Sequence, residues 1–292
     1  PRLIPQPAML GEPERHGVCP LAGGPLVSAA VELFVLGSGS SGNTAILRAT
    51  GTTVMIDAGL GPRKTLARLD AAGVAADEIE AVLLTHEHGD HAGGLPSLLG
   101  KLQCPVYATR LTAEEVRGQD PRNEKAQWRI FSSGSSFTIG SLEITAFSVP
   151  HDAVDPVGFT IRAAGTSLAV LTDLGHVNHS VVHHVTGVNC LFIEANHDED
   201  LLHRDTKRPF SIKQRIKSPH GHLSNKSAAE LASRAATDAL RRVVLGHVSR
   251  DSNEPDLAVA VVRAALAAYT DIEVMAARED ETLLVRGFAL SV

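Results

Sequence analysis

The feature that most constrains the fold is a histidine-rich segment, THEHGDH, that directly follows a short apolar strand. The strand is predicted at residues 81–84, and His86, His88, Asp90 and His91 fall within the seven residues after it. Alternate residues of an extended segment point the same way, so His86 and His88 can chelate one ion while the other two turn toward a second. Imidazole and carboxylate groups are good ligands for Zn²⁺, Mn²⁺ and Fe. The spacing therefore favours a metal site over a polar turn with surface histidines.

The same pattern recurs along the chain, because several other predicted strands end close to a histidine or an acidic residue. His151, Asp173, Glu194 and His247 all lie at or just after such strand ends. Sheet proteins assemble their sites from residues of this kind, drawn from distant parts of the chain. Two metals need more ligands than one loop supplies, and a carboxylate such as Asp173 can bridge two cations. We therefore predict a ligand set of five histidines and two aspartates: His86, His88, Asp90, His91, His151, Asp173 and His247.

Short strands dominate the beginning of the chain and later alternate with helices, which indicates an α/β fold. Residues 29–292 are predicted to form one domain, and the proline-containing residues 1–28 a flexible N-terminal extension. A capping-box spacing of Ser227 and Glu230 predicts where one helix begins. Strands are predicted at 31–36, 44–47, 53–56, 81–84, 142–146, 167–171, 190–193, 243–245, 272–275 and 282–285, and helices at 62–72, 227–240 and 257–268.

Composition narrows the class of protein. The formal net charge of −6 excludes a generally basic surface, so a nucleic-acid partner would need a local basic patch. Cys19, Cys104 and Cys190 are widely spaced and odd in number, which predicts reduced thiols in a cytoplasmic protein. No apolar run approaches the roughly 20 residues of a membrane-spanning helix, so no membrane partner is expected.

The strand-end motifs resemble those of the metallo-β-lactamase-fold hydrolases, which occur in the same order along the chain. The resemblance spans about residues 31–292 and implies a four-layer αββα sandwich. It also implies that Asp57 fixes the ligand loop by hydrogen bonds without touching metal. In that family one metal would be held by His86, His88 and His151, the other by Asp90, His91 and His247, and Asp173 would bridge them.

The resemblance implies two divalent cations, Zn or Mn, with Fe also compatible, and places Asp90 among the catalytic residues. Two metals roughly 3.5–4 Å apart can activate a water, whose pKa falls from about 15.7 towards about 7, so that hydroxide is available at neutral pH. Such a centre would serve phosphodiesters, thioesters, lactones and β-lactams equally, and the fold alone does not choose among them.

Two further segments resemble the paired Glu-Ala-Thr and Gly-His-Ser-Thr motifs of the tRNA-processing enzyme tRNase Z. They are residues 193–196, which contain Glu194, and residues 221–229, which contain His222. In that family a glutamate orients a histidine that protonates the leaving oxygen. Carried over, Glu194 would hold His222, and His222 would be the general acid or would bind the scissile phosphate. The alternative is a surface acid and a histidine at the start of a helix.

A basic run lies just before His222 and carries a single acid, Asp205. In an acidic chain this local reversal of charge suits a polyanion, although a solvated charged loop is an equally good interpretation. Its cations are Arg204, Lys207, Arg208, Lys213, Arg215 and Lys217.

Three segments together resemble the YycJ/WalJ-type branch, which is associated with single-stranded DNA exonuclease activity from the 5′ end. They are SGSSGN at 38–43, residues 212–216, and GHLSN at 221–225. The interval from Asp173 to His247 is too short for the large cap domain of the β-CASP nucleases, which favours small or single-stranded substrates.

We therefore predict a dinuclear-metal phosphodiesterase or nuclease that acts on single-stranded DNA as a 5′ exonuclease. The alternative is a metallo-hydrolase of small substrates such as a lactone, thioester or β-lactam. The SGSSGN loop lacks the Gly-Lys-Ser/Thr end of a P-loop and joins two strands, but we expect it beside the metals, where it can meet a phosphate. The predicted substrate contacts are Ser38, Ser40, Ser41, Asn43, Lys213, Arg215 and Asn225.

Overall fold

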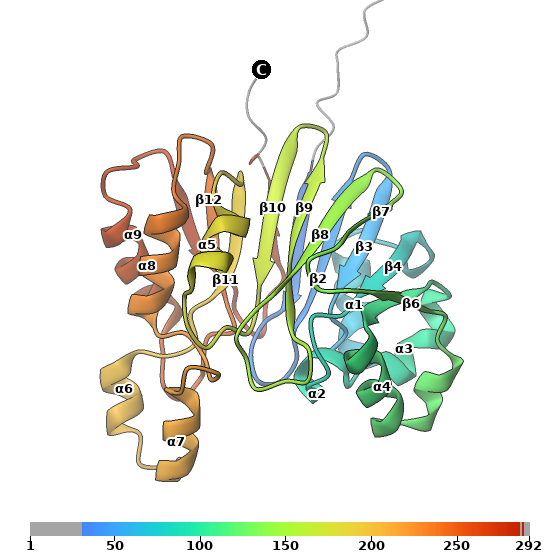
Figure 1. The fold of residues 1–292 in the computed structure, drawn as a ribbon, viewed down its shortest axis with the longest axis horizontal. Helices are drawn as coiled ribbons and strands as arrows, with labels where there is room; N and C mark the ends of the chain where they lie inside the picture. The colour runs from blue at the N-terminus through green and yellow to red at the C-terminus, as the bar shows by residue number, and fades with distance from the viewer. Residues whose placement is uncertain (1–30, 287, 289–292) are drawn as a thin grey trace, which may run out of the picture.

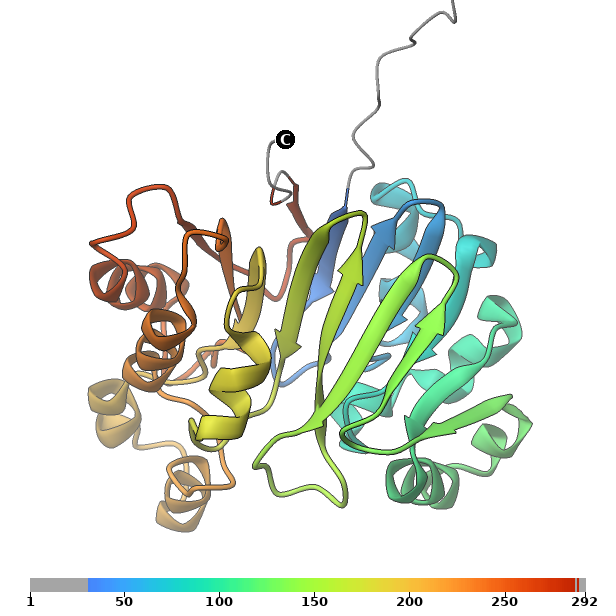
Figure 2. The same cartoon turned by 45° about the horizontal axis from the view of Figure 1, so that its top comes forward.

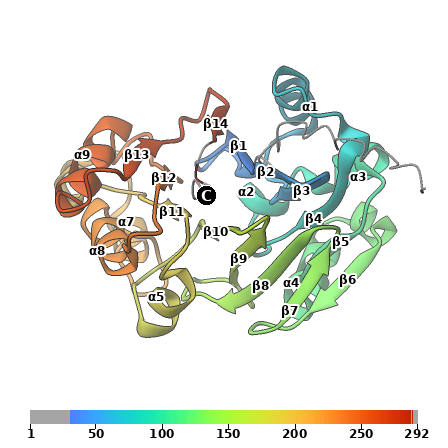
Figure 3. The same cartoon turned by 90° about the horizontal axis from the view of Figure 1, so that it is seen from above.

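The fold is seen in a computed structural model that describes residues 31–286 and 288 (Figure 1). The extension predicted at residues 1–28 lies outside the described residues. Two seven-stranded sheets face each other, and helices cover the outer face of each, which confirms the predicted αββα arrangement (Figure 3). Among the described residues, no helix has both the length and the apolar character needed to cross a membrane.

The first sheet has the strand order β14-β1-β2-β3-β4-β5-β6. The outer face of this sheet packs against helices α1, α3 and α4. The strands are β1 (Glu32–Gly37), β2 (Thr44–Ala49), β3 (Thr52–Ile56), β4 (Ile79–Leu83), β5 (Val106–Thr109), β6 (Trp128–Phe131) and β14 (Leu283–Val285), and the helices are α1 (Pro62–Ala71), α2 (Gly89–Ala92), α3 (Leu95–Leu102) and α4 (Arg110–Gln119).

The second sheet has the order β13-β12-β11-β10-β9-β8-β7, and its outer face packs against α5, α8 and α9. Two short helices, α6 and α7, project beyond the ends of its strands (Figures 1 and 2). The strands are β7 (Ser136–Ile139), β8 (Leu142–Ser148), β9 (Val157–Ala163), β10 (Thr166–Leu171), β11 (Cys190–Glu194), β12 (Arg242–Gly246) and β13 (Glu273–Ala276), and the helices are α5 (His179–Val185), α6 (Glu199–Arg204), α7 (Phe210–Ile216), α8 (Asn225–Ala235) and α9 (Pro255–Ala265).

The core follows from the two-residue alternation of the strands. In β1, Leu33 and Val35 point into the layer between the sheets, whereas Phe34 and Leu36 point toward the helices. Every β1 residue is buried, so residues 33–36 form a continuous apolar run and do not alternate with polar residues. Both faces of each sheet are thus covered, and the strand ends are left as the place for polar chemistry.

The parallel strands determine where that polar chemistry collects. β3 to β6 run parallel to one another, and so do β10 to β13. The carboxyl ends of parallel strands meet at one edge of a sheet, and ligands bind there in open α/β sheets. The residues that follow β3, β4, β10, β11 and β12 therefore come from distant parts of the sequence to one end of the sandwich.

Some predicted elements differ from the structure. Strands β5, β6, β7 and β9 were not predicted, and the first three have only four residues each, too short for a clear alternation. The predicted helix at 227–240 is α8, which begins at Asn225 and ends at Ala235. Its cap is Ser224, whose hydroxyl accepts a hydrogen bond from the backbone N–H of Ser227, so the predicted capping box is wrong.

Candidate metal centre and active site

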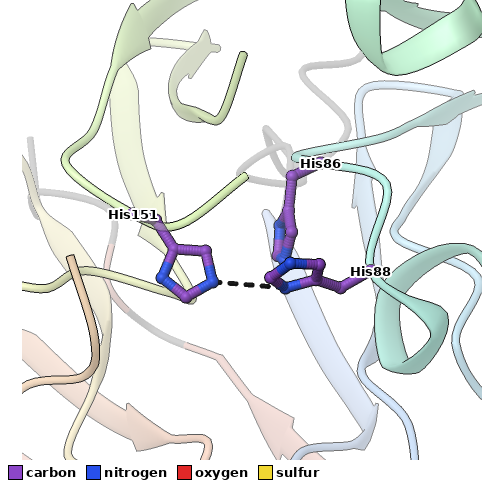
Figure 4. Close-up of side chains that lie close together, drawn as sticks. All are labelled: His86, His88 and His151. Carbon is purple, nitrogen blue, oxygen red and sulfur yellow. Dashed lines mark hydrogen bonds between the residues drawn. The ribbon is translucent and has the colours of Figure 1, made fainter. Parts of the chain in front are cut away.

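Three histidines from two loops converge at the end of the sandwich (Figure 4). His86 and His88 follow β4, and His151 follows β8 on the opposite sheet. Nδ1 of His88 lies 3.3 Å from Nε2 of His151, and one ligand atom from each ring lies within 4.8 Å of the others. The structure thus brings together the three residues predicted to hold one metal.

A second group lies next to the first. Asp90, His91 and His247 present ligand atoms within 4.8 Å of one another. Asp173 belongs to a third group with His86 and His91, and its Oδ2 lies 2.7 Å from Nε2 of His91. Since Asp173 reaches toward both groups, its position fits a bridging carboxylate.

Hydrogen bonds fix which nitrogen of three of these rings faces inward. Nδ1 of His91 lies 2.8 Å from the Asp57 carboxylate, and Nδ1 of His151 lies 3.0 Å from the carbonyl oxygen of Gly221. Nδ1 of His247 lies 2.9 Å from Oε1 of Glu194. Carboxylate and carbonyl oxygens only accept, so each Nδ1 donates and each Nε2 is left for a ligand.

Asp57 acts beneath the ligand loop and is not part of any of the ligand groups. Besides His91, its carboxylate accepts hydrogen bonds from the backbone N–H of Thr85 at 2.8 Å and from the Thr85 hydroxyl. Asp57 has a φ of 58°, in the left-handed region that a non-glycine residue rarely adopts. This geometry fits the role predicted for it, to hold the start of the loop and the ring of His91.

Glu194 is fully buried and organises two strand ends at once. Its Oε1 lies 2.7 Å from Nδ1 of His222 and 2.9 Å from Nδ1 of His247, while Oε2 accepts the backbone N–H groups of Leu174 and Leu223. The predicted contact with His222 is present. The contact with His247, a candidate ligand, was not foreseen from the sequence.

Burial and the neighbouring carboxylates shift the pKa values of the candidate histidine ligands. Burial lowers the pKa of His91, but the carboxylates of Asp173 and Asp57 outweigh it and raise that pKa well above its ordinary value. Burial likewise lowers the pKa of His247, and Asp173 with its neighbours raises it well above the ordinary value. Burial lowers the pKa of His86 well below its ordinary value. The chain alone would therefore hold protons on His91 and His247, which a cation would displace.

The donor set fits divalent metal ions. Nε2 of His86 is buried and has no hydrogen-bond partner in the described part of the chain, as expected for an atom that binds something else. Imidazole nitrogens and carboxylate oxygens suit Zn²⁺, Mn²⁺ and Fe, and no thiolate is present in the groups. Unpaired imidazoles and close carboxylates are costly to bury without a cation to neutralise them.

A cavity of about 240 Å³ opens over these groups. His88, Asp90, Asp173 and His247 line one side of it, and His222 lies among them. Burial lowers the pKa of His222, but the carboxylates of Glu194 and Asp173 raise it to about 9. Because Nδ1 faces Glu194, Nε2 is the nitrogen of His222 that is left for a substrate.

The predicted substrate contacts divide into two groups. Ser40 and Arg215 line the cavity. Ser41 is exposed but does not line it, and Lys213 turns away, with its ammonium 3.1 Å from the carbonyl oxygen of His203. Lys213 is therefore not brought to the site.

Three other predicted contacts are buried and bind protein groups. Ser38 accepts the backbone N–H of His247 at 2.7 Å, and Asn43 accepts the N–H of Gly39 and contacts the ligand loop, with its own backbone N–H 2.7 Å from the carbonyl of Asp90. The SGSSGN loop does lie beside the candidate ligands, but these two side chains support it. Asn225, only 1% exposed, exchanges two 2.8 Å hydrogen bonds with Asn253. The expectation that Asn225 contacts substrate is therefore corrected.

Several cavity residues were not predicted. Arg208 belongs to the basic run, but nothing in the sequence distinguished it from its neighbours. Asn196, Ile212 and Ile216 stand in segments that carried the family resemblance but were not assigned a role, and Ser249 carried no signal. Three of these five residues, Arg208, Ile212 and Ile216, come from the α6–α7 region, in which only Lys213 and Arg215 were predicted to contact substrate. Helix α7 and the residues just before it bring these three side chains to the cavity.

Comparison with known proteins places the chain in a family. The family model described as "Beta-lactamase superfamily domain" matches residues 52–248. The exodeoxyribonuclease YycJ of Bacillus anthracis is 36% identical over 227 residues, which cover 77% of this chain and 84% of that protein. The exodeoxyribonuclease WalJ of Streptococcus pneumoniae is 34% identical, with 77% and 84% covered. The metallo-β-lactamase fold protein YhfI from Bacillus subtilis superposes with a TM-score of 0.68 at 18% identity, covering 89% of this chain and all of that one.

The fold and the ligand groups define a metal-dependent hydrolase with the metallo-β-lactamase fold. Within it, the chain belongs to the YycJ/WalJ family of the β-lactamase superfamily, as the combined SGSSGN and GHLSN motifs predicted.

Proposed function

We propose that the protein is a metal-dependent exodeoxyribonuclease that degrades single-stranded DNA from the 5′ end. The observation that carries this proposal is the contact of buried Glu194 with His222, 2.7 Å away, because His222 lines the same cavity as four candidate ligands and two arginines. An acid for the leaving oxygen together with cations suits a phosphodiester, whereas a lactone or thioester carries no phosphate charge for the arginines to bind. The names of the YycJ and WalJ relatives support the same substrate class.

The proposal includes two divalent ions, Zn or Mn, held by the ligand groups as predicted, with Asp173 between them. Bound there, such ions would supply a nucleophile at neutral pH and stabilise charge on the phosphate. Asp90, at the mouth of the cavity, is proposed to hold a cation and to orient the group that attacks. A single domain at 29–292 and a cytoplasmic location complete the proposal, and the unpaired thiols of Cys104 and Cys190 support the latter.

The chain's own groups have separate tasks in this scheme. Glu194 holds the ring of His222 by Nδ1, so that Nε2 carries a proton toward the oxygen of the departing nucleotide. The buried carboxylate of Glu194 beside Nδ1 raises the pKa of His222, which favours the protonated ring that a general acid needs. Arg215 lines the cavity with its Nε bound to Asp152 at 2.5 Å, which leaves the other N–H groups of the guanidinium for a phosphate.

The test compares variants on end-labelled single-stranded DNA with added Mn²⁺ or Zn²⁺. Wild-type protein should release mononucleotides from the 5′ end. His222→Ala should lose turnover while its metal content stays as in the wild type, whereas Asp173→Ala should lose both metal and activity. Efficient hydrolysis of a lactone or thioester without DNA cleavage would contradict the proposal, and a fully active His222→Ala protein would contradict the role of His222.

A further inference from the structure

The helix α7 is the most exposed apolar element of the site region. None of its residues is buried. Phe210 is 74% exposed and Ile212 is 41% exposed, and Phe210 has the largest exposure among the large apolar side chains of the described residues. An aromatic ring left in water forgoes the free energy that its burial would contribute. Aromatic residues are also scarce in this chain, with 8 phenylalanines, 2 tyrosines and 1 tryptophan. The exposed ring is therefore a candidate contact surface.

Phe210 does not itself line the cavity, but it lies in the chain between residues that do. Arg208 and Ile212, two residues before and two residues after it, both line the cavity. Two residues of chain span at most about 7 Å, so the Cα atom of Phe210 lies within about one nucleotide spacing of the Cα atoms of two cavity-lining residues. Arg215 and Ile216, further along α7, continue that wall, and Phe210 is the exposed first residue of the same helix. A strand that leaves the cavity over the start of α7 would meet the ring.

The charge around the ring selects the class of occupant. Residues 206–220 contain five lysines and arginines and no aspartate or glutamate, in a chain whose formal net charge is −6. Such a concentration of positive charge favours a polyanion over an ordinary protein surface. Proteins that bind single strands combine a cationic groove with aromatic rings on which unpaired bases stack. Phe210 with its flanking cations has this combination.

The helix is held firmly enough to serve as a support. Arg208 forms ion pairs with Asp205 at 2.8 Å and with Asp251 at 3.1 Å, which tie the start of α7 to the loop after β12. Arg215 forms one with Asp152 at 2.5 Å, in the loop that carries a candidate ligand, His151. Since both ends are anchored, a base stacking on Phe210 would not have to order the helix first.

We propose that Phe210 is a stacking platform for an unpaired base of the DNA strand, next to the nucleotide in the cavity. The inference rests on the proposed function and adds to it a site that reads the single-stranded state, because only an unpaired base offers its face to the ring. Arg208 and Arg215 would bind the backbone of the same strand on the cavity side.

The experiment measures kcat and KM of the metal-loaded protein on single-stranded DNA. Phe210→Ala should raise KM about 5- to 150-fold, the effect of one stacked base, with a smaller change in kcat. Phe210→Leu should behave like the alanine variant, because leucine keeps apolar area but has no π-face. Phe210→Trp should keep the KM of the wild type. The matched control is Ile130→Ala, a 51% exposed apolar residue on the edge strand β6, which should change neither constant.

Substrates with a single abasic position provide the decisive arm. For wild-type protein, removing the base that stacks should raise KM by the same factor as Phe210→Ala, and in the alanine variant it should have no further effect. Wild-type KM for Phe210→Ala, or additive effects of the two changes, would overturn the platform. A shift in sedimentation from dimer to monomer with KM unchanged would also overturn it and would identify the ring as a contact between copies of the chain. If wild-type protein cleaves no single-stranded DNA, the proposed function fails and the platform with it.

Discussion

Substituting Glu194 with glutamine tests the organisation of the site most directly, because this one carboxylate accepts four hydrogen bonds. Oε1 faces Nδ1 of His222 and of His247, and Oε2 faces the backbone N–H groups of Leu174 and Leu223. All four partners donate. The side chain is fully buried, so water cannot replace a lost acceptor. An amide of the same shape offers one acceptor atom in place of two.

The magnitude follows from the two ways the amide can be placed. If its NH₂ group faces the backbone, two buried N–H donors lose their acceptor, at about 1–3 kcal/mol each, or about 2–6 kcal/mol in total. If it faces the histidines, both rings must accept at Nδ1. Nε2 of His247 then carries the proton and is no longer a metal ligand. The substitution therefore lowers either the free energy of unfolding or the metal content.

The assay measures the urea midpoint of metal-free protein and the bound metal of loaded protein for wild type and Glu194→Gln. The matched control is Glu199→Gln, on α6, where the carboxylate forms an exposed 2.9 Å ion pair with Lys226. That pair is solvent-screened, so the control should stay within about 0.5 kcal/mol of the wild type. The reasoning is refuted if Glu194→Gln matches the wild type in urea midpoint, metal content and turnover.

Three further predictions concern residues around the centre. Asp57→Asn should weaken metal binding by about 10- to 100-fold, because His91 loses the carboxylate that orients it; competition with a chromophoric chelator measures this. Asn225→Ala should cost about 1–3 kcal/mol in urea unfolding by removing its two hydrogen bonds with Asn253, and should leave KM for DNA as in the wild type. Burial lowers the pKa of His197 to about 4 against an ordinary 6.5, so the free energy of unfolding should fall as the pH drops from 6.5 to 4. His197→Phe should remove about 3 kcal/mol of that fall, and an unchanged pH dependence of the urea midpoint would contradict it.

The candidate ligands could be predicted from the sequence because their chemistry is local. Buried strands are apolar, so a histidine or aspartate at a strand end stands out, as His86 and Asp173 do. Parallel pairing then brings such ends together without any further information from the sequence. The fold class follows from the same strands, whose apolar residues are continuous because both faces of each sheet are covered.

The role of a polar residue near the ligands could not be predicted in the same way. Asn43 and Asn225 both stand in motifs beside candidate site residues, and a motif does not distinguish an amide that binds substrate from one that binds protein. The partner that decides this, Asp90 for Asn43 and Asn253 for Asn225, is distant in sequence. The helix α7 escaped prediction for a related reason: with no buried face it has no apolar period.

The ligand geometry depends on atoms that bind no metal. Asp57, the Gly221 carbonyl and Glu194 each accept from Nδ1 of one candidate ligand ring, and they come from three separate regions of the chain. Each bond keeps Nδ1 as the donor and fixes the orientation of the ring, so that Nε2 is the nitrogen of all three rings that a cation can bind. Because Glu194 also holds His222, the ring proposed as acid is fixed to the same carboxylate as a candidate ligand. Glu194 is the last residue of β11, so a displacement of this strand would move His222 and His247 together. The distance between the proposed acid and the candidate metal site is therefore set by the position of one strand.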